Sequence, residues 1–207
     1  MADNQKVYFY YSVGSRYSYL ASTQLDALER QTGCEVIWHP LYSVDLYRLR
    51  GANPFEGEAV SGQYDWDWRR KDAERWAAYY GVPYKEPRGA VEFDPRLLAR
   101  ACVAAGLLGK VRPYSRALFG AIFAESVPRI DEQECARRAE AVGLERDRFL
   151  GRLGSPEAKE RLEQNARQAR SAGAFGVPTF VIGSEIFWGN DRLVLVRHCL
   201  EELAGRA

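Results

Sequence analysis

Strand-forming sequence is confined to the two ends of this chain, and this limits the available folds more than any other feature. Val7–Tyr11 is β-branched and aromatic throughout, which predicts a strand buried on both faces. Glu35–Pro40 predicts a second strand. Thr179–Ile182 and Glu185–Trp188 predict two more, joined by a hairpin turn at Gly183-Ser184.

Helix signals fill the rest of the chain. A helix over 16–31 would connect the first two strands as a parallel pair with a right-handed crossover. Neither end could bury a core alone, so we expect an α/β fold with one sheet split around an insertion. The predicted limits are 1–44 with 171–207 for the split domain and 45–170 for an all-helical insertion domain. The other predicted helices cover 67–80, 95–105, 110–124, 131–142, 156 to about 172, and 191 to about 204.

The charge balance restricts the partners. Lys and Arg number 29 against 28 Asp and Glu, so nothing predicts broad attraction to nucleic acid or to a lipid surface. The first six residues are polar, and no apolar run approaches the roughly 20 residues that span a bilayer. We therefore expect a cytoplasmic protein that binds neither nucleic acid nor membrane.

The cysteines and histidines predict neither redox nor metal chemistry. Four cysteines are scattered without a Cys-x-x-Cys pair, and we expect them to be small buried hydrophobes. His39 and His198 are each remote in sequence from a second ligand, so no metal site is predicted.

Ser15-Arg16-Tyr17-Ser18 lies where the first strand turns into a helix. The unpaired N–H groups of a helix N-terminus favour an anion there. Hydroxyls at Ser15 and Ser18 can hydrogen-bond each other, cap the helix, or donate to a bound thiolate. Simple capping by Ser15 is the plainer alternative.

Two further segments have candidate binding roles. A proline that begins a strand after a glycine often marks a tight functional turn with a cis peptide bond, and at Pro178 a trans proline that opens an edge strand is the plainer alternative. In the first case the exposed Val177 backbone could pair with a peptide-like ligand. Gly189 permits close backbone approach, and Asn190 and Asp191 can cap the final helix or hold a ligand ammonium group.

These segments together resemble a known family. The sequences Ser15–Ala21, Arg75–Pro83, Phe175–Thr179 and Phe187–Leu193 look like those of the 2-hydroxychromene-2-carboxylate isomerases. These belong with the kappa-class glutathione transferases in the DsbA-like thioredoxin superfamily. The resemblance covers nearly the whole chain and implies a thioredoxin fold with an inserted all-helical domain.

The resemblance also implies roles for particular residues. Ser15 occupies the position of the thioredoxin cysteine and would donate to the sulfur of bound glutathione. Val177 and Pro178 match a backbone clamp on the cysteinyl unit of glutathione, so we expect Pro178 to be cis and the Val177 backbone to face Ser15. The segment that binds the γ-glutamyl end matches Gly189, Asn190 and Asp191, and Asn53 resembles a further contact.

Two departures from the family pattern bear on binding. Arg16 stands where the family usually has proline, so its guanidinium either strengthens the anion site or points into solvent. No lysine stands where relatives carry one for a glutathione carboxylate, and Arg69, Arg70 or Lys71 could replace it. Candidate walls for an aromatic ring, or else residues of the helix packing, are Tyr64, Trp66, Trp68 and Trp76.

The predicted function is glutathione-dependent isomerisation of an aromatic hydroxy-acid hemiketal. A kappa-like transferase that conjugates glutathione to electrophiles is the nearer alternative, and a non-catalytic thioredoxin-like binding protein is the alternative of another class. Dithiol chemistry is excluded at this site because serine forms no disulfide. The expected partners are glutathione and a small aromatic acid, and a homodimer is left open.

Overall fold

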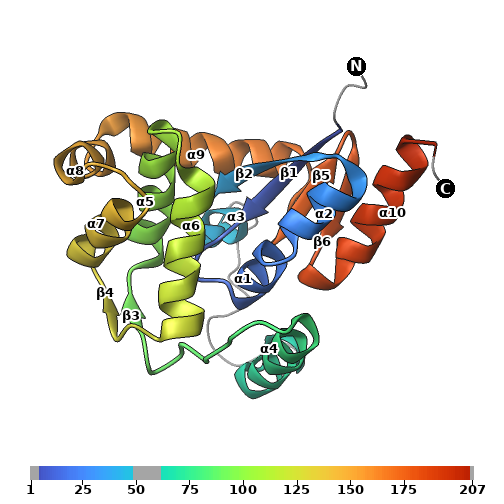
Figure 1. Ribbon diagram of the computed structural model, residues 1–207, viewed down its shortest axis with the longest axis horizontal. Helices are drawn as coiled ribbons and strands as arrows, with labels where there is room; N and C mark the ends of the chain where they lie inside the picture. The colour runs from blue at the N-terminus through green and yellow to red at the C-terminus, as the bar shows by residue number, and fades with distance from the viewer. Residues whose placement is uncertain (1–4, 49–61, 206–207) are drawn as a thin grey trace.

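The computed structural model describes residues 5–48 and 62–205. Its centre is a four-stranded mixed sheet in the order β2-β1-β5-β6 (Figure 1). β1 (Lys6–Tyr11) runs parallel to β2 (Glu35–Pro40) and antiparallel to β5 (Thr179–Ile182), which pairs with β6 (Glu185–Trp188). The four predicted strands are confirmed, so the sheet is built from both ends of the chain.

The two faces of β1 supply two separate layers of core. Val7, Phe9 and Tyr11 belong to the larger core cluster, whereas Tyr10 belongs to a smaller one. This alternation follows from the two-residue period of a strand. Helices α1, α2 and α10 contribute to the larger cluster, and α3 and α9 cover the smaller. These helices span Arg16–Ser22 (α1), Leu25–Thr32 (α2), Ser43–Arg48 (α3), Pro156–Ser171 (α9) and Leu193–Leu203 (α10).

The helical block shares its core with the sheet. The Tyr11 hydroxyl lies 2.5 Å from Ser115 Oγ, and Phe119 packs against the Tyr11 ring in the same cluster. The predicted domain limits at 44 and 171 stay a prediction, and α3 runs across the first of them. The remaining elements are α4 (Trp66–Tyr80), β3 (Glu92–Phe93), α5 (Pro95–Leu107), α6 (Val111–Gly120), the π-turn η2 (Ala121–Glu125), β4 (Arg129–Ile130), α7 (Glu132–Ala141), α8 (Arg146–Leu153), and the 3₁₀ turns η1 (Gly62–Tyr64) and η3 (Asn190–Arg192).

Side-chain caps begin the helices where the sequence predicts them. The Asp94 carboxylate accepts the Arg96 N–H at 2.8 Å ahead of α5, and Ser155 Oγ accepts the Ala158 N–H at 3.2 Å ahead of α9. Both caps are followed by proline at the first helical position, where its missing N–H costs nothing.

The helix predicted over 16–31 is interrupted. It ends at Ser22 and begins again at Leu25. The Ser22 hydroxyl donates to the Tyr19 carbonyl and the Thr23 hydroxyl to the Leu20 carbonyl, each at 2.7 Å. Such back-bonding by Ser and Thr competes with the main-chain ladder and bends a helix, which accounts for the break.

The sequence did not predict the helices α3 and α8, the turn η1 or the two-residue strands β3 and β4. The start of α8 is capped by Glu145, which accepts the N–H groups of Asp147 and Arg148. Glutamate is not among the preferred capping residues, so the sequence carried no start signal there. The strands β3 and β4 are too short for alternation to be visible.

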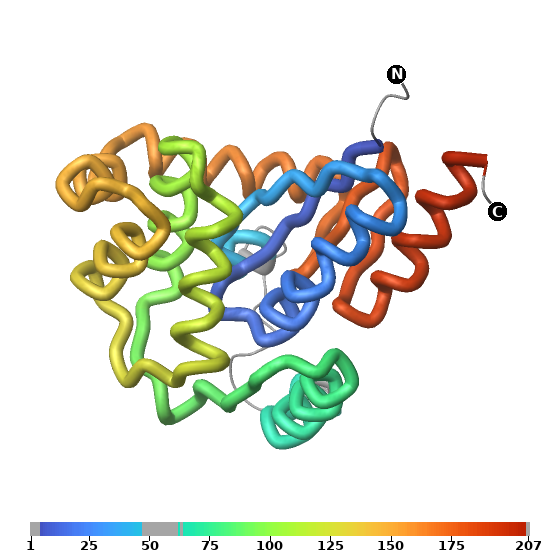
Figure 2. The backbone as a smooth tube through the Cα atoms, in the orientation of Figure 1, coloured from blue at the N-terminus to red at the C-terminus, as the bar shows by residue number. Residues whose placement is uncertain are grey.

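Helix α4 lies at the edge of the molecule, away from the rest of the helical block (Figures 1 and 2). The chain that leaves α4 passes below α1 on its way to β3 (Figure 2). The segment 83–88 is thereby placed against the start of α1: the Tyr19 hydroxyl donates to the Pro83 carbonyl at 2.5 Å, and Arg16 pairs with Glu86.

Candidate functional site

Ser15 sits at the turn between β1 and α1. It is the N-cap of α1, and its Oγ accepts the Ser18 N–H at 3.3 Å. Because the oxygen acts as acceptor in that bond, the hydroxyl hydrogen can still be donated to another group. Ser15 is half-buried. Ser15 thus caps α1 through its oxygen and can still donate its hydroxyl hydrogen to a ligand.

Ser18 braces the same turn from inside. It is fully buried, and its Oγ lies 3.4 Å from the Ser12 N–H, a long hydrogen bond. A Cβ on Gly14 would lie 3.1 Å from the Phe93 ring of β3, so the absence of a side chain lets the turn meet the helical block. The two serines bond the backbone of the turn, and the Ser15 side chain is held by its neighbours.

The Val177-Pro178 peptide bond is cis, as predicted. Thr179 follows it and pairs with Tyr10, so the start of β5 lies beside the end of β1. This register brings the Ser15 turn and Val177 to the same edge of the sheet. Among the described residues, none hydrogen-bonds the Val177 backbone. That backbone is half-buried and can pair with an extended ligand.

The segment after β6 adjoins this edge. The Gly189 N–H donates to the Pro178 carbonyl at 3.0 Å. Asn190 is buried, and its carbonyl accepts the Tyr80 hydroxyl at 3.2 Å. Asp191 is partly exposed and pairs with Arg192 at 3.2 Å. Neither Asn190 nor Asp191 caps α10 with its side chain; they form η3, and α10 begins after it with no side-chain cap.

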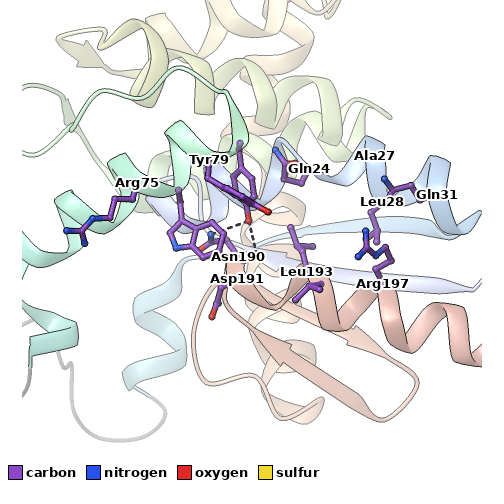
Figure 3. A pocket seen from close by; sticks show the side chains of 13 residues that line it. Gln24, Ala27, Leu28, Gln31, Arg75, Tyr79, Asn190, Asp191, Leu193 and Arg197 are labelled. Atoms are coloured by element: carbon purple, nitrogen blue, oxygen red, sulfur yellow. Dashed lines mark hydrogen bonds between the residues drawn. The ribbon is translucent and has the colours of Figure 1, made fainter. Parts of the chain in front are cut away.

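A groove of about 840 Å³ runs between α2, α4 and α10. In Figure 3, Arg75 lies at one end of it and Gln31 and Arg197 at the other, with Tyr79, Asn190 and Asp191 between them. Trp76 also lines the groove and packs on Tyr80, with ring centroids 5.3 Å apart. Ser15, Val177 and Pro178 are not among its lining residues. Asn190 and Asp191 of η3 line the groove and Ser15 does not, so the groove neighbours the turn that carries Ser15 and is a separate cavity.

The predicted aromatic walls do not gather at one place. Trp66 is at the start of α4. The centre of its ring lies 5.3 Å from the guanidinium carbon of Arg16, the residue that follows Ser15 in the chain. Trp76 belongs to the groove. Trp68 is 46% exposed, and Tyr64 is half-buried in η1. The predicted contact Asn53 lies outside the described residues.

Arg16 does not point into solvent. Its side chain is only 7% exposed, and its Nη2 donates to Glu86 Oε1 at 2.9 Å. The sequence could not reveal this partner, because Arg16 and Glu86 are far apart in the chain and Glu86 belongs to no periodic pattern. The sequence did not predict that Glu86 and Arg88 lie beside Arg16 and Trp66.

The cysteines sit where thiolates are disfavoured. Cys34, Cys102 and Cys135 are buried, as expected, and Cys199 is half-buried. Burial raises the pKa of both Cys102 and Cys135 to about 12, and it also raises the pKa of Cys34 and Cys199. A reactive cysteine needs the opposite, a lowered pKa in an exposed and electropositive place.

A family model described as the DSBA-like thioredoxin domain matches residues 6–201. The chain belongs to this family. A 2-hydroxychromene-2-carboxylate isomerase from Sphingobium xenophagum is 31% identical over 189 residues, which are 89% of this chain and 92% of the relative. One from Pseudomonas putida is 29% identical over 196 residues, 94% of both chains. Within the DSBA-like family, the chain thus belongs with these isomerases.

Solved structures agree with this placement. The structure of a 2-hydroxychromene-2-carboxylate isomerase superposes with a TM-score of 0.81 at 28% identity over 96% of both chains. A probable DsbA oxidoreductase from Streptomyces coelicolor gives a TM-score of 0.71 at 18% identity over 99% of this chain and 92% of its own, which shows the fold alone. The predicted α/β thioredoxin fold of the DsbA-like type is confirmed, and relatives named as isomerases support an enzymatic role.

The described residues contain no group of three or more His, Cys, Asp or Glu side chains arranged to hold a metal ion. No described helix has both the length and the apolar character needed to cross a bilayer.

Proposed function

We propose that this protein is a glutathione-dependent isomerase that acts on 2-hydroxychromene-2-carboxylate or a similar aromatic hydroxy or keto acid. The observation that carries the proposal is the Ser15 hydroxyl, half-buried at the β1–α1 turn, at the same edge of the sheet as the Val177 backbone, which has no hydrogen-bond partner among the described residues. The names of the relatives supply the reaction class.

The residues present fit glutathione. A tripeptide needs a backbone partner, and the Val177 N–H and C=O have none among the described residues. An ammonium group needs a carboxylate, and that of Asp191 is partly exposed near the same edge. Asn190 is already bonded to Tyr80, so it would contribute chiefly by holding η3 in place, with Gly189 allowing the close approach.

When bound, glutathione would supply a thiolate that adds reversibly to a conjugated carbon, so that a double bond becomes a single bond that can rotate. The task of Ser15 is to donate its hydroxyl hydrogen to the sulfur. An ordinary thiol has a pKa near about 8.5 and is mostly protonated at neutral pH. A hydroxyl donor, aided by the N–H groups of the first turn of α1, favours the ionised form.

The aromatic residues would orient the second substrate. Trp66 is the most suitable of them, because it adjoins Arg16 and thus the Ser15 turn. Tyr64 ends η1, two residues before Trp66, and Trp68 lies in the first turn of α4, two residues after it. Trp76 lines the groove instead. Fixing a flat substrate against a thiolate lowers the barrier by positioning.

The dependence on a thiol is testable directly. Protein freed of small molecules is mixed with 2-hydroxychromene-2-carboxylate, and the ultraviolet spectrum is followed with glutathione, with S-methylglutathione, and with neither. We expect conversion to the isomer with glutathione alone, and no net consumption of thiol. Equal conversion with no thiol present would refute the proposed mechanism. Steady consumption of glutathione would indicate a transferase.

A further inference from the structure

We propose that Arg16 and Arg88 form a carboxylate-binding site beside the Trp66 indole, and that it holds the acid group of the aromatic substrate. This inference rests on the proposed function and gives it a specific substrate subsite. The residues come from three parts of the chain: the start of α1, the start of α4 and the segment that follows α4.

Glu86 fixes the positions of both arginines. Its Oε1 accepts the Arg16 Nη2 at 2.9 Å and the Arg88 backbone N–H at 3.1 Å. Its Oε2 accepts the Tyr84 hydroxyl at 2.8 Å. Both carboxylate oxygens are therefore engaged, and one of them joins Arg88 directly to Arg16.

Donors remain after these bonds are made. Arg16 Nη1 is buried, in a side chain that is only 7% exposed, and it has no hydrogen-bond partner in the part of the chain that the structure describes. Buried donors are normally satisfied, so an orphan on a charged group marks a place where a ligand acceptor fits. Among the described residues, the Arg88 guanidinium has no carboxylate partner, and Arg88 is exposed.

Three guanidinium groups surround the indole. Arg16, Arg69 and Arg88 all lie within 5.9 Å of the centre of the Trp66 ring. Two of the nearby carboxylates are already hydrogen-bonded: Glu86, as described, and Asp72, which accepts the Tyr17 hydroxyl at 2.8 Å. This concentration of guanidinium groups favours an anionic ligand beside the ring.

The indole identifies which carboxylate belongs here. Trp66 offers an aromatic face between guanidinium groups, so the complementary ligand carries both a ring and a carboxylate. Glutathione has carboxylates and no ring. Because Nη1 is buried as the side chains lie, a ligand acceptor can reach it only if a neighbouring side chain moves; Glu86 holds the Arg88 backbone, and the Arg88 side chain beside the same indole is exposed.

The test is binding of trans-2-hydroxycinnamate and of its neutral amide, each measured by titration calorimetry on the glutathione-loaded protein. Arg16→Gln and Arg88→Gln should each weaken binding of the acid by roughly ten- to a hundredfold, the loss expected for one charge-assisted contact. Binding of the amide should change little. Arg16→Lys keeps the charge and loses the planar fork, so it should recover only part of the affinity.

Arg112→Gln is the matched control. Arg112 also bonds carboxylates, with its Nη1 3.1 Å from Glu29 Oε1, and its guanidinium carbon lies 5.9 Å from the centre of another indole ring, that of Trp38. This variant should bind the acid as the unaltered protein does. Equal losses for acid and amide in Arg16→Gln would overturn the inference, because they indicate a structural role.

Glutathione affinity, measured separately, distinguishes the two proposals. If the unaltered protein binds no glutathione, the proposed function fails, and the acid-over-amide preference can still be measured on the protein alone. If Arg16→Gln loses glutathione and keeps its preference for the acid, the subsite belongs to glutathione and the inference is wrong.

Discussion

The Gly189 N–H donates a 3.0 Å hydrogen bond to the Pro178 carbonyl, and this bond joins the two C-terminal segments of the candidate site. Pro178 follows Val177, which lies at the same edge of the sheet as the Ser15 turn, and Gly189 leads into Asn190 and Asp191. This bond thus fixes Asn190 and Asp191, proposed to bind the γ-glutamyl end of glutathione, relative to Val177, proposed to bind its cysteinyl backbone.

Gly189→Ala should disturb both segments at once. Gly189 has φ +117° and ψ 154°, a conformation essentially restricted to glycine, and an added Cβ would run into the Asp191 carboxylate. We expect a loss of about 1–3 kcal/mol in the free energy of unfolding. Urea denaturation measures it, and calorimetry should show weaker binding of glutathione.

Gly183→Ala is the control for that variant. Gly183 also has a positive φ (+58°), but no atom lies within 4 Å of the position of an added Cβ. This change should cost about 1 kcal/mol and leave glutathione affinity unaltered. If both variants lose stability equally and both bind normally, Gly189 has no special role.

The sheet could be predicted because its signals are local. β1 is β-branched and aromatic, and the hairpin at Gly183 has a turn residue between two strand-like runs. The caps at Asp94 and Ser155 were visible for the same reason, since a cap and the following proline are adjacent in sequence. Local patterns could not predict that residues from the two ends of the chain form one binding site; that prediction came from the resemblance to the isomerases.

Long-range contacts were not predictable. Whether Arg16 faces solvent or protein depends on Glu86, and no rule of spacing connects these residues. The break after Ser22 arises from hydroxyls that bond the preceding turn, which a hydrophobic stripe does not reveal. The groove between α2, α4 and α10 likewise exists only because three segments distant in sequence come together.

The protein should not catalyse reduction of insulin by dithiothreitol. Ser15 and Ser18 cannot form a disulfide, and a raised pKa keeps each of the four cysteines mostly as the thiol at neutral pH. Insulin turbidity should therefore develop at the rate of the blank without protein. A faster rate that disappears on changing Cys199, the half-buried cysteine, to serine would contradict this prediction.

Asp26 should make stability fall at acid pH. A hydrogen bond from Arg116, at 2.8 Å, lowers the pKa of Asp26 from its ordinary value of about 3.9, with help from Arg112. The contribution is complete above pH 4 and is lost as the pH falls further, because the unfolded chain takes up the proton first. Since the carboxyl group is 46% exposed, we expect about 1 kcal/mol or less.

Urea denaturation of the unaltered protein and of Asp26→Asn, at pH 7 and at pH 3, isolates this effect. The variant should be less stable at pH 7, and the difference between the two proteins should be smaller at pH 3. A difference between them that is the same at both pH values would show that Asp26 acts through packing and not through its charge.

Ser15→Ala decides whether the hydroxyl is more than a cap. A cap alone is worth about 1 kcal/mol of stability and has no effect on the acidity of a bound thiol. A charge-assisted hydrogen bond to the thiolate is worth roughly 1.5–3 kcal/mol. Since each pKa unit corresponds to about 1.36 kcal/mol, the pKa of bound glutathione should rise by about one to two in the variant. Thiolate absorbance, titrated against pH in both complexes, measures the difference.

Ser155→Ala gives the matched comparison, because Ser155 caps α9 with nearly the same geometry: its Oγ accepts an N–H at 3.2 Å, against 3.3 Å for Ser15. Both variants lose one cap and should lose similar stability. Only Ser15→Ala should raise the pKa of bound glutathione, because Ser15 lies at the same edge of the sheet as Val177, whereas Ser155 begins α9. If both variants titrate with the midpoint of the unaltered protein, Ser15 is a cap alone and the proposed mechanism loses its central residue.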